Sequence, residues 1–465
     1  MSRCPVYPKP SKTRSRGLMT FIRKRRSWLD SLYERSYSMK MGELRLPALK
    51  LFMPNQPELV KRIMLDEVAQ FPKHSLLHEQ LEPLLGDSIF TTNGDVWRRQ
   101  RDMLDVAFGN REVERVFPAM QACADKMFSR IEARGDLSEQ AFDIEQEMTL
   151  VTADVIFRTI MSTELDASEA AKVLDAFERF QKRSPRYALL RMFGVPRGRF
   201  LSFLDRKRVR DAKTVRHYIH RAIGARYDAF QDKGEDDFGD ILSQILKAKD
   251  QSGSGFTLDE TVDQVAMLFL AGHETSASAL SWSIYLLALY PEWQTKIRAE
   301  FAGLGSYTDW KVTDVKGFST ARLVFMEALR LYPPVGFFMR EAGSDTQMRD
   351  KQIEKESLLV VSPWLLQRHT ELWDEPKQFC PMRFSAQSQR EGAVPKNGYI
   401  PFGLGPRVCI GAAFALQEAT LLLCALLQRY EFGLKEGFDP DPVGRLTVRS
   451  ENGIWVYLNK LKRTE

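Results

Sequence analysis

The sequence predicts one large, mainly helical domain with a minor β region, built around a single long central helix. Three observations predict this fold. Helical patterning dominates residues 57–247, and an uninterrupted helical pattern follows a capping sequence at residue 257. Segments that resemble strands are confined to residues 39–53 and to the chain beyond residue 331. No internal repeat divides the 465 residues, and 44% hydrophobic content is sufficient for one extensive core.

The first 26 residues are expected to form a separate, disordered leader ahead of the main domain, residues 27–465. They contain nine Lys or Arg and no acidic residue. Subtracting nine from the 67 basic residues leaves 58 against 61 acidic ones, so the main domain carries a net charge of −3. The overall charge of +6 therefore belongs to the leader, and the composition does not predict nucleic-acid binding.

The composition predicts a monomeric cytoplasmic protein without a transmembrane anchor. The longest uncharged run, residues 275–291, contains serines and is too short for a comfortable bilayer span. No signal-peptide pattern is present. The five cysteines form no CxxC pair and are odd in number, which favours a reducing compartment over a disulfide framework.

The elements follow from local patterns. Residues 39–53 alternate and predict a hairpin of strands, with Pro47 near its turn. Glycines and the stretch RSPR at residues 183–186 mark loops within the helical region. Thr257 and Glu260 form a capping box that begins the long helix, which Pro291 ends. At about 1.5 Å per residue this helix is roughly 50 Å long, enough to cross the domain.

A cysteine among glycines, in the stretch FGLGPRVCIG, directly precedes the last predicted helix. Cys409 stands two residues after Arg407 and two before Gly411. A helix N-terminus and a neighbouring guanidinium both favour the thiolate form of a cysteine. Thiolates serve as nucleophiles, redox partners or metal ligands, and this stretch alone leaves all three open.

The long helix contains the stretch AGHETSAS. Gly272 costs about 1 kcal/mol relative to alanine inside a helix, so it indicates a bulge or a close approach of another element. Glu274 and Thr275 place an acid beside a hydroxyl, and a local widening of the helix would create a polar notch there. Taken alone, a packing glycine beside two solvent-facing polar residues is the commoner explanation.

Three further polar patterns are weak individually. Glu327 and Arg330 are spaced i, i+3 on one helix face, as in many surface pairs. Trp97 and Arg101 are spaced i, i+4 and could hold a carboxylate, although an exposed basic helix is more common. Arg383 lies in the stretch CPMRF.

Together, and in this order, the motifs closely resemble those of the cytochrome P450 family. The motifs are W-x-x-x-R at 97–101, A-G-x-E-T at 271–275, E-x-x-R at 327–330, P-x-R-F at 381–384 and F-x-x-G-x-R-x-C-x-G at 402–411. The last motif is highly specific, and no signature position departs from the family pattern. The resemblance covers about residue 40 to the C-terminus and implies that residues 27–465 form a P450 haem domain whose long helix crosses the haem.

The resemblance implies that the protein binds haem b, with Cys409 as the axial thiolate ligand of the iron. A thiolate ligand pushes electron density onto iron and favours O–O cleavage. The other implied haem contacts are Phe402, Arg407, Trp97, Arg101, Arg340, Ala271 and Gly411. Glu327, Arg330 and Arg383 match the family's buried charge network, which holds the cysteine loop in register and has a structural role.

Thr275 and Glu274 match the family's alcohol–acid pair, which delivers protons to bound dioxygen. The resemblance therefore implies a monooxygenase that inserts one oxygen atom from O2 into a hydrophobic substrate, by hydroxylation or epoxidation. A fatty acid or long-chain lipid is the expected substrate, with a terpenoid or steroid as the alternative. Arg35 or Lys40 is the candidate anchor for a carboxylate. The expected pocket residues are Leu76, Leu77, Ile89, Phe90, Phe269, Val335, Phe337 and Phe338.

Because the chain is too short to include a flavin reductase, electrons from NAD(P)H are expected to arrive through a separate redox partner. The resemblance to soluble, bacterial-type members of the family implies that this partner is a ferredoxin with its reductase. Arg98 and Arg99 are candidates for the docking face. A zinc-protease HExxH is excluded because Ala277 replaces the second histidine. A dinucleotide fingerprint fails because Val408 stands where its third glycine would be. The remaining alternative is a non-oxygenating haem scaffold, a peroxygenase or an isomerase of the same fold.

Overall fold

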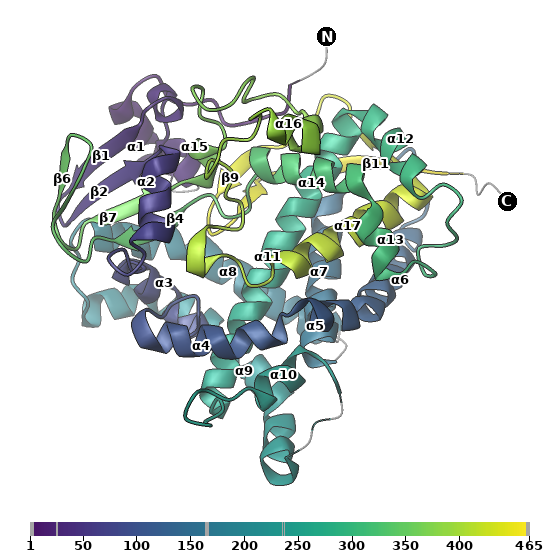
Figure 1. The fold of residues 1–465 in the computed structure, drawn as a ribbon, viewed down its shortest axis with the longest axis horizontal. Coiled ribbons are helices and arrows are strands. Elements are labelled where there is room, and N and C mark those ends of the chain that lie inside the picture. The colour runs from purple at the N-terminus through teal and green to yellow at the C-terminus, as the bar shows by residue number, and fades with distance from the viewer. Residues whose placement is uncertain (1–3, 25–26, 163–166, 235, 237, 462–465) are drawn as a thin grey trace.

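The structure is a computed structural model, which describes residues 4–24, 27–162, 167–234, 236 and 238–461. Helices surround the long helix α11 in the middle of the molecule, and most of the strands lie together at one side (Figure 1). The predicted architecture, a single mainly helical domain with a minor β region, is confirmed. None of the described helices has an apolar stretch long enough to cross a bilayer.

The helices of the described residues occupy most of the chain. They are α1 Arg14–Lys24, α2 Pro57–Lys61, α3 Ser75–Leu85, α4 Gly94–Ala107, α5 Asn110–Arg115, α6 Phe117–Glu132, α7 Ile144–Met161, α8 Ala167–Met192, α9 Arg199–Lys233, α10 Ile241–Lys247, α11 Leu258–Leu289, α12 Pro291–Glu300, α13 Val312–Gly317, α14 Ser319–Leu331, α15 Pro363–Leu366, α16 Ala386–Arg390 and α17 Ala412–Arg429.

The strands are short and form one sheet of four strands, one of three and two ribbons. They are β1 Met41–Leu46, β2 Leu49–Pro54, β3 Phe142–Asp143, β4 Phe338–Glu341, β5 Thr346–Met348, β6 Lys351–Ile353, β7 Leu358–Val361, β8 Tyr430–Leu434, β9 Pro442–Gly444, β10 Val448–Ser450 and β11 Trp455–Lys460. The four-stranded sheet has the order β1-β2-β7-β4, with β2 and β7 parallel. The pairing of Leu46 with Leu49 confirms the predicted hairpin and its turn at Pro47.

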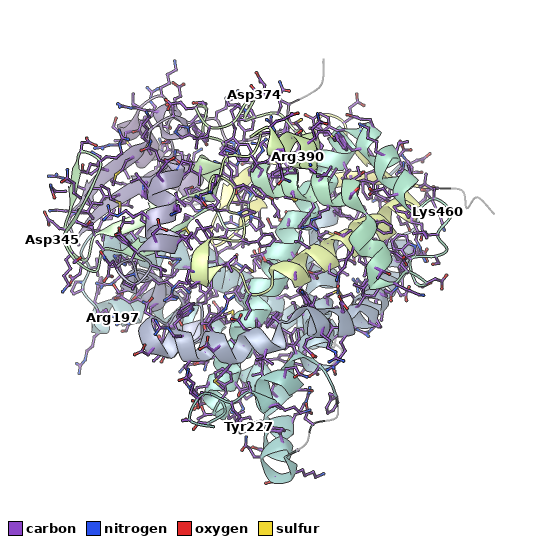
Figure 2. All side chains as sticks on the ribbon, in the orientation of Figure 1. Arg197, Tyr227, Asp345, Asp374, Arg390 and Lys460 are labelled. Atoms are coloured by element: carbon purple, nitrogen blue, oxygen red, sulfur yellow. The ribbon has the colours of Figure 1, made fainter. Side chains whose placement is uncertain are left out.

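Helix α11 begins and ends where the sequence predicts. The Thr257 hydroxyl accepts from the Glu260 N–H at 3.2 Å, and the Glu260 carboxylate accepts from the Thr257 N–H at 2.8 Å, so the capping box is confirmed. The helix is buried along most of its length and packs against α7, α9, α14 and α17. Side chains fill the space around it, and the labelled Arg197 and Tyr227, near the two ends of α9, lie at the margin (Figure 2).

The predicted disordered leader is wrong over residues 4–24, which the structure describes as part of the fold. Residues 14–24 form helix α1, and Gly17 lies so close to the turn at Trp28–Ser31 that a Cβ there would be 2.7 Å from the Ser31 carbonyl oxygen. Further upstream, the Val6 N–H donates to the Tyr285 hydroxyl at 3.1 Å. The basic composition predicted disorder, but the buried Gly17 brings α1 into close contact with the domain.

The predicted loop at residues 183–186 is also wrong, because α8 continues through it. Proline removes one backbone donor and normally breaks a helix. Here tertiary contacts outweigh that loss: Arg183 and Arg179 both pair with the buried Asp211 of α9. The two helices are thereby held together in the turns of α8 directly before Pro185.

Candidate active site

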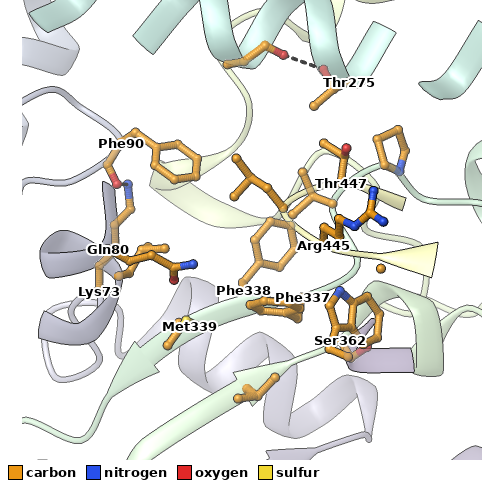
Figure 3. A pocket seen from close by; sticks show the side chains of 18 of the residues that line it. Lys73, Gln80, Phe90, Thr275, Phe337, Phe338, Met339, Ser362, Arg445 and Thr447 are labelled. Carbon is orange, nitrogen blue, oxygen red and sulfur yellow. Dashed lines mark hydrogen bonds between the residues drawn. The ribbon is translucent and has the colours of Figure 1, made fainter. Parts of the chain in front are cut away.

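An internal cavity of about 530 Å³ lies between α11, α3, α4, β4 and the loop that precedes α17. Cys409 lines one side of the cavity and Thr275 of α11 another. In Figure 3, Phe337 and Phe338 project into the middle of this space, with Lys73 and Phe90 on one flank and Thr447 on the other. The cavity therefore brings together residues from widely separated motifs.

Two left-handed glycines shape the cysteine loop. Gly403 has φ 80° and Gly405 has φ 73°, and a Cβ on Gly405 would lie 2.1 Å from the Met64 carbonyl oxygen. The Cys409 N–H donates to the Phe402 carbonyl at 2.8 Å, which closes the loop just before α17 begins. This geometry directs the Cys409 thiol into the cavity.

Burial raises the pKa of the Cys409 thiol, and the Gly411 N–H and the Arg101 guanidinium offset this rise only in part. The sequence predicted the opposite shift. The reason is that Arg407 turns away from the sulfur: its Nη2 donates to Asn93 Oδ1 at 2.9 Å, and its guanidinium lies 4.2 Å from the Trp97 ring centroid. A bound metal cation would oppose this rise in the pKa, because metal ions deprotonate a coordinating thiol.

Four cationic side chains converge on the cavity beside Cys409: Lys73, Arg101, Arg340 and Arg407. Arg101 pairs with Asp105 at 2.7 Å and also donates to the Val408 carbonyl, which ties α4 to the cysteine loop. Among the described residues, no carboxylate lies within ion-pair distance of the other three. Sequence analysis missed Lys73, since nothing in the stretch FPKHS distinguishes it from a surface lysine.

Among the described residues, no carboxylate balances the positive charges of Lys73, Arg340 and Arg407, so a bound anion would complete the site. Burial, followed by the charges of Arg407, Arg340 and Arg101, lowers the pKa of Lys73 well below its usual value. Burial lowers the pKa of Arg340 to about 10, and burial with the Arg340 charge lowers the pKa of Arg407 to about 9. Arg340 Nε is buried with no hydrogen-bond partner among the described residues. Carboxylates, such as the two propionates of haem, fit these unpaired cations.

Thr275 lies over the cavity on a regular helix. Its hydroxyl donates to the Ala271 carbonyl at 2.5 Å, as the dashed line in Figure 3 marks. The helix is continuous here, so the predicted widening is wrong, while the predicted close approach at Gly272 is confirmed. A Cβ on Gly272 would lie 2.2 Å from Cδ1 of Ile156 on α7.

Glu274 also lines the cavity, but its carboxylate is held by β10 and the turn that precedes it. Oε1 accepts from the Thr447 hydroxyl at 2.7 Å, and Oε2 accepts from Nη1 of Arg449 at 2.9 Å. Burial raises the pKa of Glu274, but Arg449, the neighbouring His273 and Thr447 outweigh it and lower this pKa below its usual value. Neither Thr447 nor Arg449 belongs to a sequence motif, so sequence analysis missed both.

Glu327 joins the two arginines predicted for it. Both carboxylate oxygens accept from Arg330 at 2.7 Å, and Oε1 lies 3.5 Å from Nε of Arg383. Arg330 also donates to the Gln367 carbonyl, and the Gln367 side chain accepts from the Ile400 N–H at 2.9 Å. The network thus reaches the segment that enters the cysteine loop, through a glutamine that no motif indicates.

The expected pocket residues line the cavity with one exception. Leu76, Leu77, Ile89, Phe90, Val335, Phe337 and Phe338 do so. Phe269 does not: it is buried on the opposite side of α11, where its ring stacks on His273 and contacts Phe157. The prediction is wrong because residues two apart in a helix, such as Phe269 and Ala271, point in roughly opposite directions.

A buried acid, Glu418, links α17 to α11. Oε2 accepts from the Ser276 hydroxyl at 2.6 Å, whereas Oε1 is buried without a partner among the described residues. Burial raises the pKa of Glu418 to about 8, an effect that the Ser276 hydrogen bond only partly offsets. Near neutral pH the group is therefore mostly a neutral carboxylic acid.

We expect Glu418 to make the free energy of unfolding depend on pH. The unfolded state loses this proton near pH 4.5 and the folded state near pH 8, so its contribution to stability falls across that interval. The full difference is about 5 kcal/mol as an order of magnitude. Glu418→Gln is expected to remove this slope in urea denaturation at pH 5 and pH 8.5, whereas an exposed control, Glu178→Gln, keeps it. Parallel pH profiles for wild type and Glu418→Gln would show that Glu418 is ionised in the folded protein.

Comparisons with known proteins agree with this arrangement. The family model for cytochrome P450 matches residues 23–455. Cyclooctatin synthase of Streptomyces melanosporofaciens is 29% identical over 391 residues, covering 83% of this chain and 82% of the relative. Cytokinin hydroxylase of Arabidopsis thaliana is 27% identical over 411 residues, covering 87% and 78%. Human cytochrome P450 4F12 is 26% identical over 486 residues, covering 99% and 90%.

The fold has a close match among solved structures. The crystal structure of the cytochrome P450DA heme domain superposes with a TM-score of 0.79 at 22% sequence identity and covers 91% of this chain and 90% of its own. At this identity the match concerns the fold alone. The family model, however, spans most of the chain, and so the chain belongs to the cytochrome P450 family of monooxygenases.

Proposed function

We propose that this protein is a haem-thiolate monooxygenase in which Cys409 is the axial ligand of haem b and Thr275 with Glu274 manages proton delivery. The observation that carries the proposal is the convergence of Cys409, Thr275 and an unpaired cationic cluster on one cavity. Haem, when bound, supplies the reductive activation of dioxygen. Lys73, Arg340 and Arg407 would hold its propionates, and Arg101 would keep the cysteine loop in place.

The chain's own residues prepare the oxygen side of the cavity. The Thr275 hydroxyl donates to Ala271, so its oxygen lone pairs are free to accept from a water or a reduced-oxygen species. The small side chains of Ala271 and Gly272 leave space beside it. Apolar walls from Phe90, Phe337 and Phe338 exclude bulk water and favour a hydrophobic substrate.

For the substrate, we propose a long-chain lipid such as a fatty acid. Beyond Thr275 the apolar lining continues to β1 and to α1, where Leu44, Leu18 and Phe21 line the outer end. An extended apolar space of this kind suits a flexible chain. Neither Arg35 nor Lys40 lines the cavity, whereas Arg14 of α1 does, so Arg14 replaces them as the candidate partner of a carboxylate.

Absorbance titration of the purified ferric protein tests this substrate. Saturated fatty acids of increasing length are expected to give a low-to-high-spin shift that is strongest at one chain length, because the lipid that fits displaces water from the iron. Ala271→Phe, which fills the space beside Thr275, is expected to weaken that shift at least tenfold. A shift with a terpene or a steroid, and with no fatty acid, would overturn the lipid proposal and favour the ring-bearing substrates.

We propose that electrons come from NAD(P)H through a separate protein of the ferredoxin type. The support is a mixed apolar and basic surface near the cysteine loop, where Val96, Val106 and Val408 are exposed and Arg98 extends into solvent. Arg99 does not contribute, because it pairs with Asp250 and Glu260. A monomeric, cytoplasmic protein is part of the same proposal.

A further inference from the structure

Arg449 connects two buried carboxyl groups on different helices. Its Nε donates to Glu145 Oε1 at 2.6 Å, its Nη1 to Glu274 Oε2 at 2.9 Å, and its Nη2 to the Thr149 hydroxyl at 2.6 Å. Glu145 and Thr149 belong to the first turns of α7, and Arg449 belongs to β10. Three elements far apart in the sequence therefore meet at one guanidinium.

All three side chains are largely buried, and Arg449, which contacts both carboxyl groups, is the most exposed of them. Glu274 is 4% exposed, Glu145 is 8% exposed and Arg449 is 20% exposed. Only Glu274 of the three lines the cavity. The cluster therefore extends from the oxygen side of the cavity toward solvent.

This cluster contains one positive charge, on Arg449, and two carboxyl groups, those of Glu145 and Glu274. If both were ionised, the buried site would carry a net negative charge, which is costly in a low-dielectric interior. Burial raises the pKa of Glu145. The charge of Arg449 and its hydrogen bond lower this pKa, the charges of Asp143 and Glu274 raise it, and the net shift is upward. Glu274 has the opposite shift. These opposite pKa shifts make Glu145 the more basic of the two carboxyl groups and favour it as the place for a proton that the pair shares.

The other charged groups around the cluster do not supply a second cation. Asp143, at the start of α7, accepts from the Glu145 N–H and adds negative charge. On α11, His273 lies 3.8 Å from Glu274, but burial lowers its pKa and its Nδ1–H donates to the Phe269 carbonyl, so it is neutral. Thr447 contributes only a hydroxyl.

We propose that Glu145 stores the proton that Glu274 passes to the Thr275 side of the cavity, and that Arg449 positions both carboxyl groups by neutralising whichever one is ionised. This inference rests on the proposed monooxygenase function. It adds a carboxyl group that belongs to none of the motifs.

The transfer conserves charge and electrons. An O–H bond breaks on Glu145 and one forms on Glu274, by way of a water between them, and no electrons are exchanged. Before and after the step the cluster contains one guanidinium, one carboxylate and one neutral acid, so its net charge is zero. Because Arg449 contacts both groups, the step creates no unpaired buried charge. Glu145 then regains its proton from solvent.

Infrared titration of the haem-loaded ferric protein tests where the proton resides. Two carboxylic C=O bands that persist above the usual pH range of glutamate are expected, from Glu145 and Glu418. Glu145→Gln is expected to remove one band, and Glu418→Gln the other. Glu147→Gln is the matched control, because Glu147 is also buried on α7 but pairs with Arg130 and, among the described residues, forms no hydrogen bond or ion pair with Glu274. The exposed Glu139→Gln replaces it as control should Glu147→Gln not fold.

Turnover separates a proton-storing role from a structural one. In Glu145→Gln, at equal haem content, product formation per electron is expected to fall at least threefold, hydrogen peroxide release to rise, and the pH profile to change shape, while the control keeps the wild-type values. Retention of both infrared bands in Glu145→Gln, or wild-type coupling, would overturn the inference. Absence of product from the wild type itself would instead overturn the proposed function, and the infrared result would stand separately.

Discussion

Replacing Cys409 by serine is expected to abolish oxygen insertion into substrate, a loss of more than a thousandfold in turnover, while the protein still folds. The physical reason is that a serine hydroxyl cannot supply the electron density that a thiolate donates to iron. The loop itself depends on Gly403, Gly405 and the hydrogen bond between Cys409 N–H and Phe402 O, none of which serine alters. The measurements are the carbon monoxide difference spectrum of the reduced protein and product formation with reductant and oxygen.

The matched control is Cys380→Ser. Cys380 is half-buried, lies outside the cavity and is expected to be replaceable without change in either measurement. A Cys409→Ser protein with the wild-type spectrum would contradict the assignment of the ligand. A wild-type protein with the thiolate spectrum but no product under any reductant would favour the alternative of a non-oxygenating scaffold.

Replacing Glu327 by alanine is expected to lower the free energy of unfolding by about 3–5 kcal/mol, because it leaves two buried guanidinium groups without their counter-charge. The side chains of Glu327 and Arg330 are completely buried, and Glu327 Oε1 also accepts from the Cys380 N–H at 2.9 Å. Urea denaturation of the haem-loaded protein measures the change. Haem loss during purification is expected as well, since the network reaches the cysteine loop through Gln367.

An exposed ion pair provides the comparison. Glu178 and Lys182 are spaced i, i+4 on α8 with side chains 60% and 53% exposed, so Glu178→Ala is expected to change stability by less than about 0.5 kcal/mol. Comparable losses in Glu327→Ala and Glu178→Ala would show that the buried network is not a principal source of stability.

The structure changes how the alcohol–acid pair should be understood. The motif places Glu274 beside Thr275, but the carboxylate is fixed by Arg449 of β10 and by Thr447 of the turn that precedes it. Before Glu274 could deliver a proton toward Thr275, its carboxyl group would therefore have to leave Arg449. Glu145 also contacts Arg449 and can neutralise the arginine's charge when this happens.

The sequence by itself determined the elements whose cause is local. The capping box at Thr257 and the hairpin turn at Pro47 follow from hydrogen bonding and sterics within a few residues, and both are confirmed. Gly272 also indicated a close approach, but its partner, Ile156 of α7, lies far away in the sequence. The ordered motifs also predicted the family. They indicated Cys409 and Thr275 as functional residues, and both line one cavity. The capping box and the hairpin turn depend on the residues of their own segments and not on where those segments lie in the fold.

Tertiary structure alone decided the features that depend on a distant partner. Helix α1 is held against the domain by the close contact of Gly17 with Ser31, and α8 continues through Pro185 because Asp211 pairs with its arginines. The roles of Lys73 and Arg449 likewise come from burial beside charges that lie far away in the sequence. Electrostatic and packing energies depend on distance in space, and a single sequence records only distance along the chain.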